Sequence, residues 1–519
     1  MPSLESPSTI LCILILVASL YVLVSRTSRR RLPLPPGPPQ LPLLGNIFDV
    51  PSTSQWKTYA QWSKKYNSDI IYLNLAGTSV IVLSSLEATD ALLEKRSSIY
   101  SDRPDVTMVK ELMGWYFNTG LIKYGDEWRT HRRLFNKSFN IQAARNYEPH
   151  EVVGSHMLLK RLLHTPEIFL PHFRQMAGEI IMSVAYGINV LPSDDPYITL
   201  ARKAVYTFSI AFVPGLYLVD TFPILKHIPR WLPGAGFKRQ AEEWLKLSQG
   251  MLETPFAETK RQVEAGRARA SFAADSLQAL KDSENELYYQ ERHVKEVAAT
   301  MFVGGADTTV SSLSTFVLAM LANPEAQKKA QEEIDFITGG KYLPTFNDKA
   351  AMPYVSALVK EVMRWENVSP AAAPHLLITD DEYRGYRLPA GSIVIGNAWA
   401  ILHDEAMYPD PYAFKPERFL LNGKPNPAVK TPEAAFGFGR RMCPGRHMAL
   451  SSIWITVASI LATFDITKAV DEEGNIIEPS YDYTSGLLCA PTPFKCSITP
   501  RSQDAVALIE AAVSEDLPL

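Results

Sequence analysis

The sequence predicts a mainly helical protein with a small β region, and three observations lead to this. The segment from His293 to Asn323 is largely apolar and free of proline, so a single helix there would extend about 45 Å at 1.5 Å per residue. Residues 150–290 also have a mainly helical pattern. Residues 69–75 and 79–83, in contrast, alternate around Ala76-Gly77-Thr78 as two paired strands do. A small sheet therefore opens the domain.

The bulk composition excludes some classes of protein. A chain of 519 residues, 46% hydrophobic and 21% charged, can bury a large core, and its length alone permits two or three domains. The formal net charge of −3 argues against a nucleic-acid-binding protein, which usually carries a basic excess. Four cysteines, at positions 12, 443, 489 and 496, are too few for a disulfide framework, so we expect a reducing compartment.

The N-terminus predicts a membrane anchor. Residues 10–24 form an unbroken, mostly aliphatic run, and Arg26 and residues 29–31 follow it with positive charge. By the positive-inside rule the arginines and everything after them face the cytosol. A cleaved signal peptide is the alternative, since the run is short for a full span, but its charges would precede the run. We expect an anchor over residues 1–25, a basic and proline-rich hinge over 26–46, and a cytosolic catalytic domain over 47–519.

Two stretches before residue 140 carry candidate site residues. Residues 106–121 hold Met113, Trp115 and Phe117, which are candidates to line an apolar pocket, although core packing is an equal alternative for each. On the helix predicted over residues 127–133, Trp128 and Arg132 are i,i+4 neighbours and share a face. A surface amphipathic helix would show the same spacing.

The centre of the long helix is unusual for a buried segment. Gly304 and Gly305 weaken the helix, and Asp307, Thr308 and Thr309 bring polar groups to a buried face. A threonine hydroxyl that faces a ligand, beside an aspartate that relays protons, suits proton delivery. The alternative is a kinked core helix whose polar groups are satisfied internally.

Two ion-pairing groups follow the long helix. Glu361 and Arg364 stand i,i+3 on a helix predicted over residues 355–365, so their side chains can meet. Arg418, in the segment 414–419, supplies a second arginine. We expect these residues to be structural.

Cys443 lies in a glycine-rich loop, residues 436–446, just before an apolar segment that reads as a buried helix to Ala462. The positive end of a helix lowers the pKa of a thiol, which favours the thiolate, the form that binds a metal. A buried structural cysteine is the alternative.

The loop matches a longer pattern, Phe-x-x-Gly-x-Arg-x-Cys-x-Gly, through Phe436, Gly439, Arg441, Cys443 and Gly445. With this spacing it resembles the haem-binding loop of the cytochrome P450 family. The resemblance covers nearly all of residues 32–500 in order and implies the P450 fold, one haem domain behind an N-terminal transmembrane helix. It implies that Cys443 is the axial thiolate of haem b.

The resemblance also implies roles for the other residues. Haem contacts would come from Trp128, Arg132, His375, Phe436 and Arg441, with His375 standing where many relatives have an arginine. Asp307 would relay protons and Thr308 would gate them, while Glu361, Arg364 and Arg418 would form a structural lock. The substrate pocket would include Met113, Trp115, Phe117, Ala372 and Leu487.

The expected function is that of an NADPH- and O2-dependent haem-thiolate monooxygenase of the fungal microsomal type, with a basidiomycete secondary-metabolite enzyme as the nearest resemblance. It would hydroxylate or epoxidise a small lipophilic molecule, a terpenoid first, with an indole or a polyketide as alternatives. No Gly-x-Gly-x-x-Gly unit for a dinucleotide is found, so a separate NADPH-cytochrome reductase is implied. The expected location is the endoplasmic reticulum membrane. Other readings are a haem-thiolate isomerase or dehydratase, a haem sensor or carrier, and a membrane-tethered structural protein.

Overall fold

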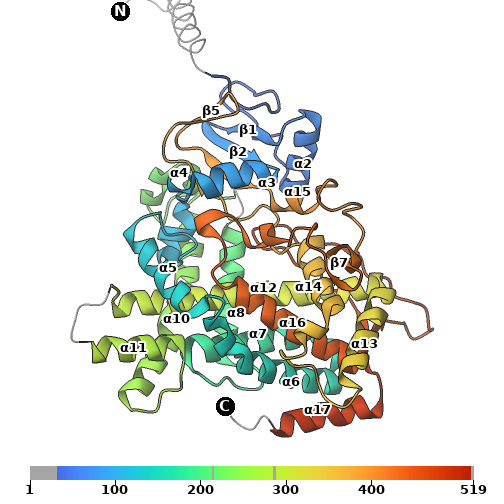
Figure 1. Ribbon diagram of the computed structural model, residues 1–519. Coiled ribbons are helices and arrows are strands. Elements are labelled where there is room, and N and C mark those ends of the chain that lie inside the picture. The colour runs from blue at the N-terminus through green and yellow to red at the C-terminus, as the bar shows by residue number, and fades with distance from the viewer. Residues whose placement is uncertain (1–31, 213–215, 284–287, 516–519) are drawn as a thin grey trace, which may run out of the picture.

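The computed structural model describes residues 32–212, 216–283 and 288–515 (Figure 1). The predicted anchor, residues 1–25, lies outside these ranges. Within them, no helix combines the length and the apolar character needed to cross a membrane.

The predicted strand pair is confirmed. β1 (Ile70–Leu75) and β2 (Thr78–Leu83) are antiparallel, and the two residues between them, Ala76 at φ 47° and Gly77 at φ 94°, have the positive φ values that a tight hairpin requires. β6 (Ile393–Gly396) lies parallel to β2, and β3 (His375–Leu376) pairs with β6, which gives the order β1-β2-β6-β3. The sheet forms the end of the domain at which the described chain begins, at the top of the view in Figure 1.

Part of the predicted hinge packs against this sheet. The carbonyl of Pro36 accepts a hydrogen bond from the Tyr72 N–H, and the carbonyl of Pro33 accepts one from the Arg387 N–H. A Cβ on Gly37 would overlap the Tyr72 carbonyl, so the chain can come this close only at a glycine. Residues 33–37 are therefore continuous with the domain.

The predicted helical character is also confirmed. In the described part of the chain, the other β structure consists of the pairs β4 (Asp381–Tyr383) with β5 (Tyr386–Leu388), β7 (Leu420–Leu421) with β8 (Lys424–Pro425), and β9 (Phe464–Lys468) with β10 (Cys496–Pro500). The helices are α2 (Gln55–Lys65), α3 (Leu86–Thr89), which a π-helical turn (Asp90–Lys95) extends, α4 (Ser97–Tyr100), α5 (Asp126–Phe139), α6 (Glu148–His164), α7 (Phe169–Tyr186), α8 (Pro196–Ala211), α9 (Leu218–Thr221), α10 (Gly236–Glu264), α11 (Phe272–Asp282), α12 (Glu291–Ala322), α13 (Pro324–Thr338), α14 (Pro353–Trp365), α15 (Ala398–Leu402), α16 (Arg446–Thr463) and α17 (Gln503–Glu515).

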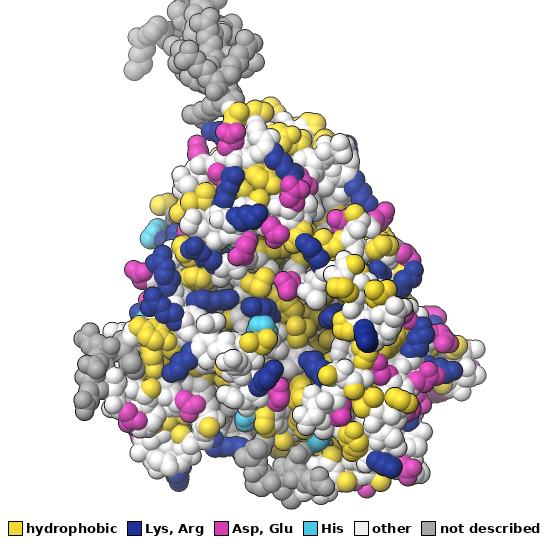
Figure 2. Space-filling view, viewed as in Figure 1, with side chains coloured by type: hydrophobic (Ala, Val, Ile, Leu, Met, Phe, Trp, Pro, Cys, Tyr) yellow, Lys and Arg dark blue, Asp and Glu magenta, His cyan; other side chains and the backbone are white. Residues whose placement is uncertain are grey.

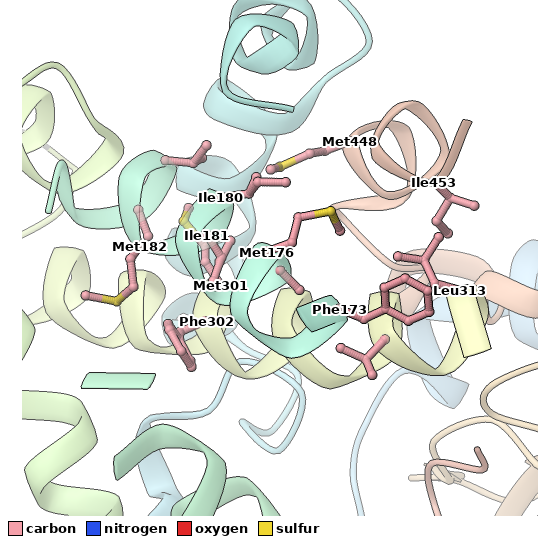
Figure 3. Close-up of a cluster of buried hydrophobic side chains, with 14 of the residues drawn as sticks. Phe173, Met176, Ile180, Ile181, Met182, Met301, Phe302, Leu313, Met448 and Ile453 are labelled. Carbon is pink, nitrogen blue, oxygen red and sulfur yellow. The ribbon is translucent and has the colours of Figure 1, made fainter. Parts of the chain in front are cut away.

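Helix α12 is the centre of the core. It is one continuous helix, as predicted, and its apolar residues are buried because α7 and α16 pack beside it. Figure 3 shows side chains of α7, α12 and α16 converging, among them Phe173, Leu313 and Ile453. An added Cβ on Gly305 would lie 3.1 Å from Ile181, so this glycine permits the close approach of α7.

The surface agrees with a chain of small net charge. In Figure 2, acidic and basic side chains are interspersed over the face that is turned to the viewer, with apolar side chains between them. The formal net charge of −3 is therefore not the product of one strongly acidic region on this face.

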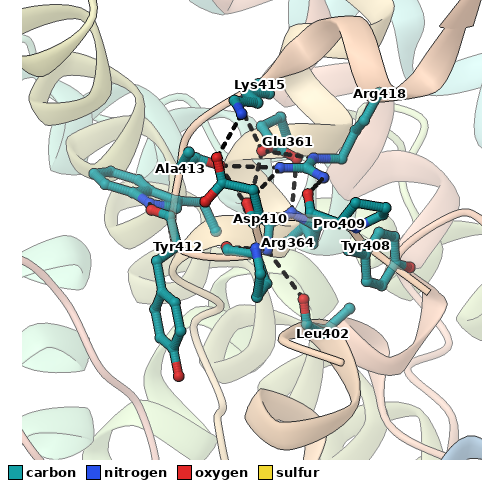
Figure 4. Close-up of polar contacts among 12 residues, drawn as sticks. Glu361, Arg364, Leu402, Tyr408, Pro409, Asp410, Tyr412, Ala413, Lys415 and Arg418 are labelled. Atoms are coloured by element: carbon teal, nitrogen blue, oxygen red, sulfur yellow. Dashed lines mark hydrogen bonds and ion pairs between the residues drawn. The ribbon is translucent and has the colours of Figure 1, made fainter. Parts of the chain in front are cut away.

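A buried ion-pair network joins α14 to the segment that follows α15 (Figure 4). Arg364 donates to both carboxylate oxygens of Glu361, at 2.7 and 2.9 Å, and Arg418 Nε donates to Glu361 Oε1 at 3.0 Å. The side chains of Glu361 and Arg364 have no exposed surface, and that of Arg418 is 6% exposed. Arg364 also donates to the carbonyls of Leu402 and Pro411, so each of its buried N–H groups is used to hold the chain.

Glu151 on α6 is a second buried acid, and it packs against the helix that follows Cys443. Its Oε1 accepts a hydrogen bond from Ser451 Oγ of α16 at 2.8 Å, and its Oε2 has no partner among the described residues. Burial raises its pKa to about 8, with repulsion from Glu148 adding to the rise, while the Ser451 hydrogen bond and Lys349 oppose it. Glu151 is therefore protonated at neutral pH.

We predict that Glu361→Gln lowers the free energy of unfolding by about 3 to 5 kcal/mol, because two buried guanidinium groups lose their counter-charge. Urea unfolding followed by circular dichroism measures the change. The matched control is Lys260→Gln, which removes an exposed ion pair with Glu291 and should change the midpoint little. Equal midpoints for the two variants would contradict a stabilising role for the network.

We also predict that stability falls as the pH rises toward 8. The pKa of Glu151 is higher in the folded protein than its ordinary value of 4.5, so the folded state binds the extra proton between about pH 4.5 and about pH 8. The contribution of Glu151 is complete below pH 4.5 and is lost at up to about 1.4 kcal/mol per pH unit above it. In Glu151→Gln, unfolding midpoints at pH 5.5 and pH 8 should differ less than in the wild type. Parallel pH profiles would rule out Glu151 as the cause.

Candidate active site

The Cys443 loop is closed by its own backbone. The Cys443 N–H donates to the carbonyl of Phe436 at 2.8 Å, and α16 begins three residues later, at Arg446. Gly439 has φ +56°, and a Cβ there would overlap the carbonyl of Leu93, so the loop requires glycine in order to rest on the π-helical turn after α3. A Cβ on Gly437 or Gly445 would meet nothing within 4 Å, so these two glycines border open space.

The expectation that the helix end lowers the pKa of the Cys443 thiol is wrong for the protein without a metal. Burial raises this pKa, and the Gly445 N–H, Arg132 and Arg446 only oppose the rise. Desolvation of the sulfur outweighs the favourable end of α16, although part of the Cys443 side chain stays exposed. A cation bound to the sulfur would have to stabilise the thiolate.

Helix α5 brings two predicted residues to this loop. Arg132 Nη1 donates to the carbonyl of Met442 at 2.7 Å, directly beside Cys443. The guanidinium of Arg441 lies over the ring of Trp128, 4.8 Å from its centroid. Arg441 also donates from Nε to the carbonyl of Ser101 and from Nη2 to the carbonyl of Ile122, both at 2.7 Å. The sequence spacing of Trp128 and Arg132 therefore places both against the loop.

Sequence reasoning missed Arg103, which completes the cluster. Its side chain is buried, Nε donates to the carbonyl of Gly120 at 2.9 Å and Nη1 donates to the carbonyl of Ala373 at 2.7 Å. His375 lies next to it, 2% exposed, with Nδ1 2.9 Å from the carbonyl of Tyr100. Only Nδ1–H can donate to that carbonyl, which leaves Nε2 for another partner. Nothing in its local sequence distinguishes Arg103 from a surface arginine.

Positive charge is in excess in this cluster. No ion pair within the described ranges joins Arg103, Arg132 or Arg441 to a carboxylate, and Asp102 only partly offsets them. Burial lowers the pKa of Arg103 to about 10 and that of Arg441 to about 8, and repulsion from Arg103 adds to the shift of Arg441. Burial and the same arginines hold the pKa of His375 well below its usual range. The cluster is suited to bind a group that carries negative charge.

The middle of α12 also faces open space. Gly304 is exposed although it lies halfway along a buried helix, and a Cβ there would meet nothing within 4 Å. Thr308 Oγ1 donates to the carbonyl of Gly304 at 2.6 Å, which places Thr308 on the same open face. Thr309 is buried instead and donates to the carbonyl of Gly305 at 2.9 Å. The helix is continuous through both glycines, and the two threonines lie on different faces.

Asp307 lines a small cavity behind this face. The cavity, of about 20 Å³, is large enough for one water molecule and is bordered also by Arg174 of α7 and Arg202 of α8. Burial raises the pKa of Asp307, and the two arginines oppose the rise. Asp307 therefore lies between charged side chains of α7 and α8 and the threonine that follows it.

The predicted pocket residues separate into two groups. Met113, Trp115 and Phe117 have no exposed surface, and Trp115 packs against Phe117 and Phe208 at centroid distances of 5.4 and 4.8 Å. None of the three borders a space that water could enter, so the structure places them in the core and does not place them on a pocket wall. Their apolar and aromatic character fits either location.

Ala372 and Leu487 lie in two loops that contact each other. Ala372 is 6% exposed and has φ 48°, a left-handed backbone that is strained for alanine. Leu487 is half-buried, and its carbonyl accepts a hydrogen bond from Ser369 Oγ at 3.0 Å. This contact ties the late loop to the segment that carries Ala372 and His375.

The arrangement of these residues is suited to bind a haem. The excess of positive charge matches the two propionate groups, which Arg103, Arg132 and Arg441 would hold. His375, neutral with its proton on Nδ1, would donate to a propionate only after its Nε2 also gained a proton. Cys443 offers a sulfur to the iron beside the cluster, in the loop that Phe436 closes, and Gly304, Gly437 and Gly445 leave room for a flat ring.

Comparison with known proteins identifies the family. The cytochrome P450 family model matches residues 35–498. A cytochrome P450 monooxygenase 98 from Postia placenta is 48% identical over 94% of each chain. A tryptamine 4-monooxygenase from Psilocybe cyanescens is 43% identical over 95% of this chain and 97% of its own, and the monooxygenase ple1 from Rhodocybe pseudopiperita is 45% identical over 92% and 91%. The chain belongs to the cytochrome P450 family, within a group of fungal monooxygenases, and is an oxidoreductase of that kind.

Proposed function

We propose that the protein inserts one oxygen atom of O2 into a C–H bond or an alkene of a small lipophilic secondary metabolite. Two electrons come from NADPH through a separate reductase, and with two protons they reduce the second oxygen atom to water. The observation that carries this proposal is the division of α12 at residues 304–308, where Gly304 and Thr308 face open space while Asp307 lines a cavity with Arg174 and Arg202.

Asp307 and Thr308 supply the protons for this reaction. Haem b, when bound through Cys443, supplies the iron at which dioxygen is reduced. Asp307 holds a proton more readily than an exposed aspartate because burial raises its pKa, and a single water in its cavity can resupply it. Thr308 Oγ1 now donates to the Gly304 carbonyl, and rotation of the hydroxyl about its C–O bond would direct its proton toward the open face.

The substrate we propose is a terpenoid. Val303 is partly exposed beside Gly304 on α12. The apolar residues Ala372 and Leu487 belong to two loops that a hydrogen bond from Ser369 joins, and the first of these loops leads to His375. Apolar walls of this kind hold a ligand by burial and not by directed hydrogen bonds. An indole is the second candidate, because a relative 43% identical to the chain is named a tryptamine 4-monooxygenase.

We also propose that the chain works at the endoplasmic reticulum membrane with its domain in the cytosol. The apolar run of residues 10–24 and the arginines after it support this orientation. The partner is a membrane-bound NADPH-cytochrome reductase, because the sequence offers no dinucleotide-binding motif of its own.

Other readings use less of the site. A haem-thiolate isomerase or dehydratase would need Cys443 but would have little use for proton delivery through Asp307 and Thr308. A sensor or carrier would need neither residue. The proton path therefore favours monooxygenation.

Turnover tests the proposal directly. Microsomal protein with a fungal reductase and NADPH is incubated with terpenoids and indoles, including tryptamine, and products are read by mass spectrometry. We expect a product heavier by one oxygen atom, and its parent identifies the substrate class. Conversion of a panel compound to an isomer without added oxygen, with or without NADPH, would instead support the isomerase reading.

We predict that Thr308→Ala retains haem but wastes reducing equivalents. Without the hydroxyl, proton delivery fails and more of the NADPH consumed yields hydrogen peroxide in place of product. The ratio of product to NADPH consumed, together with a peroxide assay, measures this.

Thr309→Ala is the matched control, because this neighbouring threonine donates to the Gly305 carbonyl in the same way but is buried. It should couple NADPH to product as the wild type does. Undiminished coupling in Thr308→Ala would show that protons reach the site by another route.

A further inference from the structure

A buried polar cluster joins α5 to α12 outside the residues assigned so far. His131 of α5 has no exposed surface, and its Nε2 lies 3.1 Å from Glu296 Oε2 of α12. Its other ring nitrogen, Nδ1, lies 2.9 Å from the hydroxyl of Thr119. Glu296 and Thr119 are also buried. One imidazole therefore connects two helices and the loop before α5.

Thr119 is fixed from a second direction. Its backbone N–H donates to Thr300 Oγ1 of α12 at 3.2 Å, and Thr300 Oγ1 donates to the carbonyl of Glu296 at 2.9 Å. The Thr119 hydroxyl also lies 3.4 Å from Thr300 Oγ1, to which it donates, so its shorter contact, at 2.9 Å, is the one with His131 Nδ1.

The loop held in this way carries the carbonyls that position the arginine cluster. The carbonyl of Thr119 accepts from Arg441 Nη1 at 3.3 Å and that of Ile122 accepts from Arg441 Nη2 at 2.7 Å. The carbonyl of Gly120 accepts from Arg103 Nε at 2.9 Å. A backbone carbonyl orients a guanidinium only as well as the backbone itself is held, so the position of Thr119 contributes to the orientation of both arginines, together with the carbonyls of Ser101 and Ala373.

The cluster is complete without a metal ion. Ligand atoms of Glu127, His131 and Glu296 lie within 4.8 Å of one another, a spacing that a cation could bridge. The guanidinium of Arg292 already pairs with Glu127 and lies 3.4 Å from Glu296 Oε2. The N–H of Gln290 donates to His293 Nδ1, so a neutral His293 carries its proton on Nε2 and is not a ligand there. Arg292 supplies the positive charge.

We propose that His131 is a positioning residue which, through the Thr119 hydroxyl, holds Arg441 and Arg103 in the geometry that sets the reduction potential of the haem. This rests on the proposed haem-dependent function. Reduction of the haem adds one negative charge, and nearby cations favour the reduced form. A loosened loop lets the arginines move and water enter, which weakens that effect and lowers the potential.

The chain offers matched substitutions at both ends of the contact. Thr119→Val removes the hydroxyl at nearly constant side-chain volume, whereas Thr119→Ser keeps the hydroxyl and removes only the methyl group. In His131→Asn the side-chain amide takes the place of Nδ1 and keeps the contact with Thr119. In His131→Gln the amide reaches the place of Nε2 and keeps the contact with Glu296 instead.

The experiment is a spectroelectrochemical titration of the haem in each purified holoprotein, with the rate of haem transfer to apomyoglobin as a second readout. We expect Thr119→Val and His131→Gln to shift the midpoint potential of the haem to more negative values. The expected shift is up to about 59 mV, which for one electron is a tenfold change in the equilibrium constant for reduction. The same two variants should lose haem several-fold faster. Thr119→Ser and His131→Asn should stay close to the wild type in both.

Equal midpoint potentials in Thr119→Val and the wild type would overturn the proposal. A shifted potential in His131→Asn with an unshifted one in His131→Gln would also overturn it, because the effect would then come from the contact with Glu296. If the His131 variants fail to load haem, the Thr119 pair decides alone. A wild-type protein that binds no haem would overturn the proposed function itself, which is a different result from a wild type with haem and unshifted variants.

Discussion

The arrangement of this protein depends on positive charge that is buried or half-buried without matching carboxylates. Arg103 and Arg132, which are near each other in the sequence, meet the distant Arg441 beside the Cys443 loop, where backbone carbonyls and the ring of Trp128 hold them. Such groups are costly to bury unless an anion joins them. This cluster bears that cost, and a haem with two propionates fits there.

The surrounding structure keeps this place rigid. Helix α12 lies across the core with its open face at Gly304, and Gly305 on the neighbouring face lets α7 pack closely enough to hold it. The network of Glu361, Arg364 and Arg418 fixes the chain between α15 and the Cys443 loop, and Glu151 binds α6 to α16. Rigid elements of this kind hold a cofactor and a proton donor at a constant distance and orientation.

Features that result from local spacing could be predicted from the sequence. Three such features are present in the structure: the pair of strands β1 and β2, the long helix α12, and the helix α5 that carries Trp128 and Arg132 on one face. Each could be predicted because it follows from a pattern that repeats roughly every two to four residues. The roles of Arg103 and Thr119 could not be predicted because they come from contacts made by folding. Arg103 donates to the carbonyl of Ala373, which is 270 positions away in the sequence, and Thr119 contacts His131, which is 12 positions away. The pKa of Cys443 was mispredicted because a helix end can be read from sequence, whereas burial cannot. Met113, Trp115 and Phe117 have the character of a pocket wall, but composition does not distinguish a wall from a core.

The central claim is that the arginine cluster exists to bind the carboxylates of haem. The most direct test compares the affinity of the haem-depleted protein for iron protoporphyrin IX and for its dimethyl ester, in which both propionates are neutral, by absorbance titration. We expect the ester to bind at least about tenfold more weakly, a difference of about 1.4 kcal/mol. Equal affinities would contradict the claim, because the buried arginines would then contribute nothing to holding the cofactor.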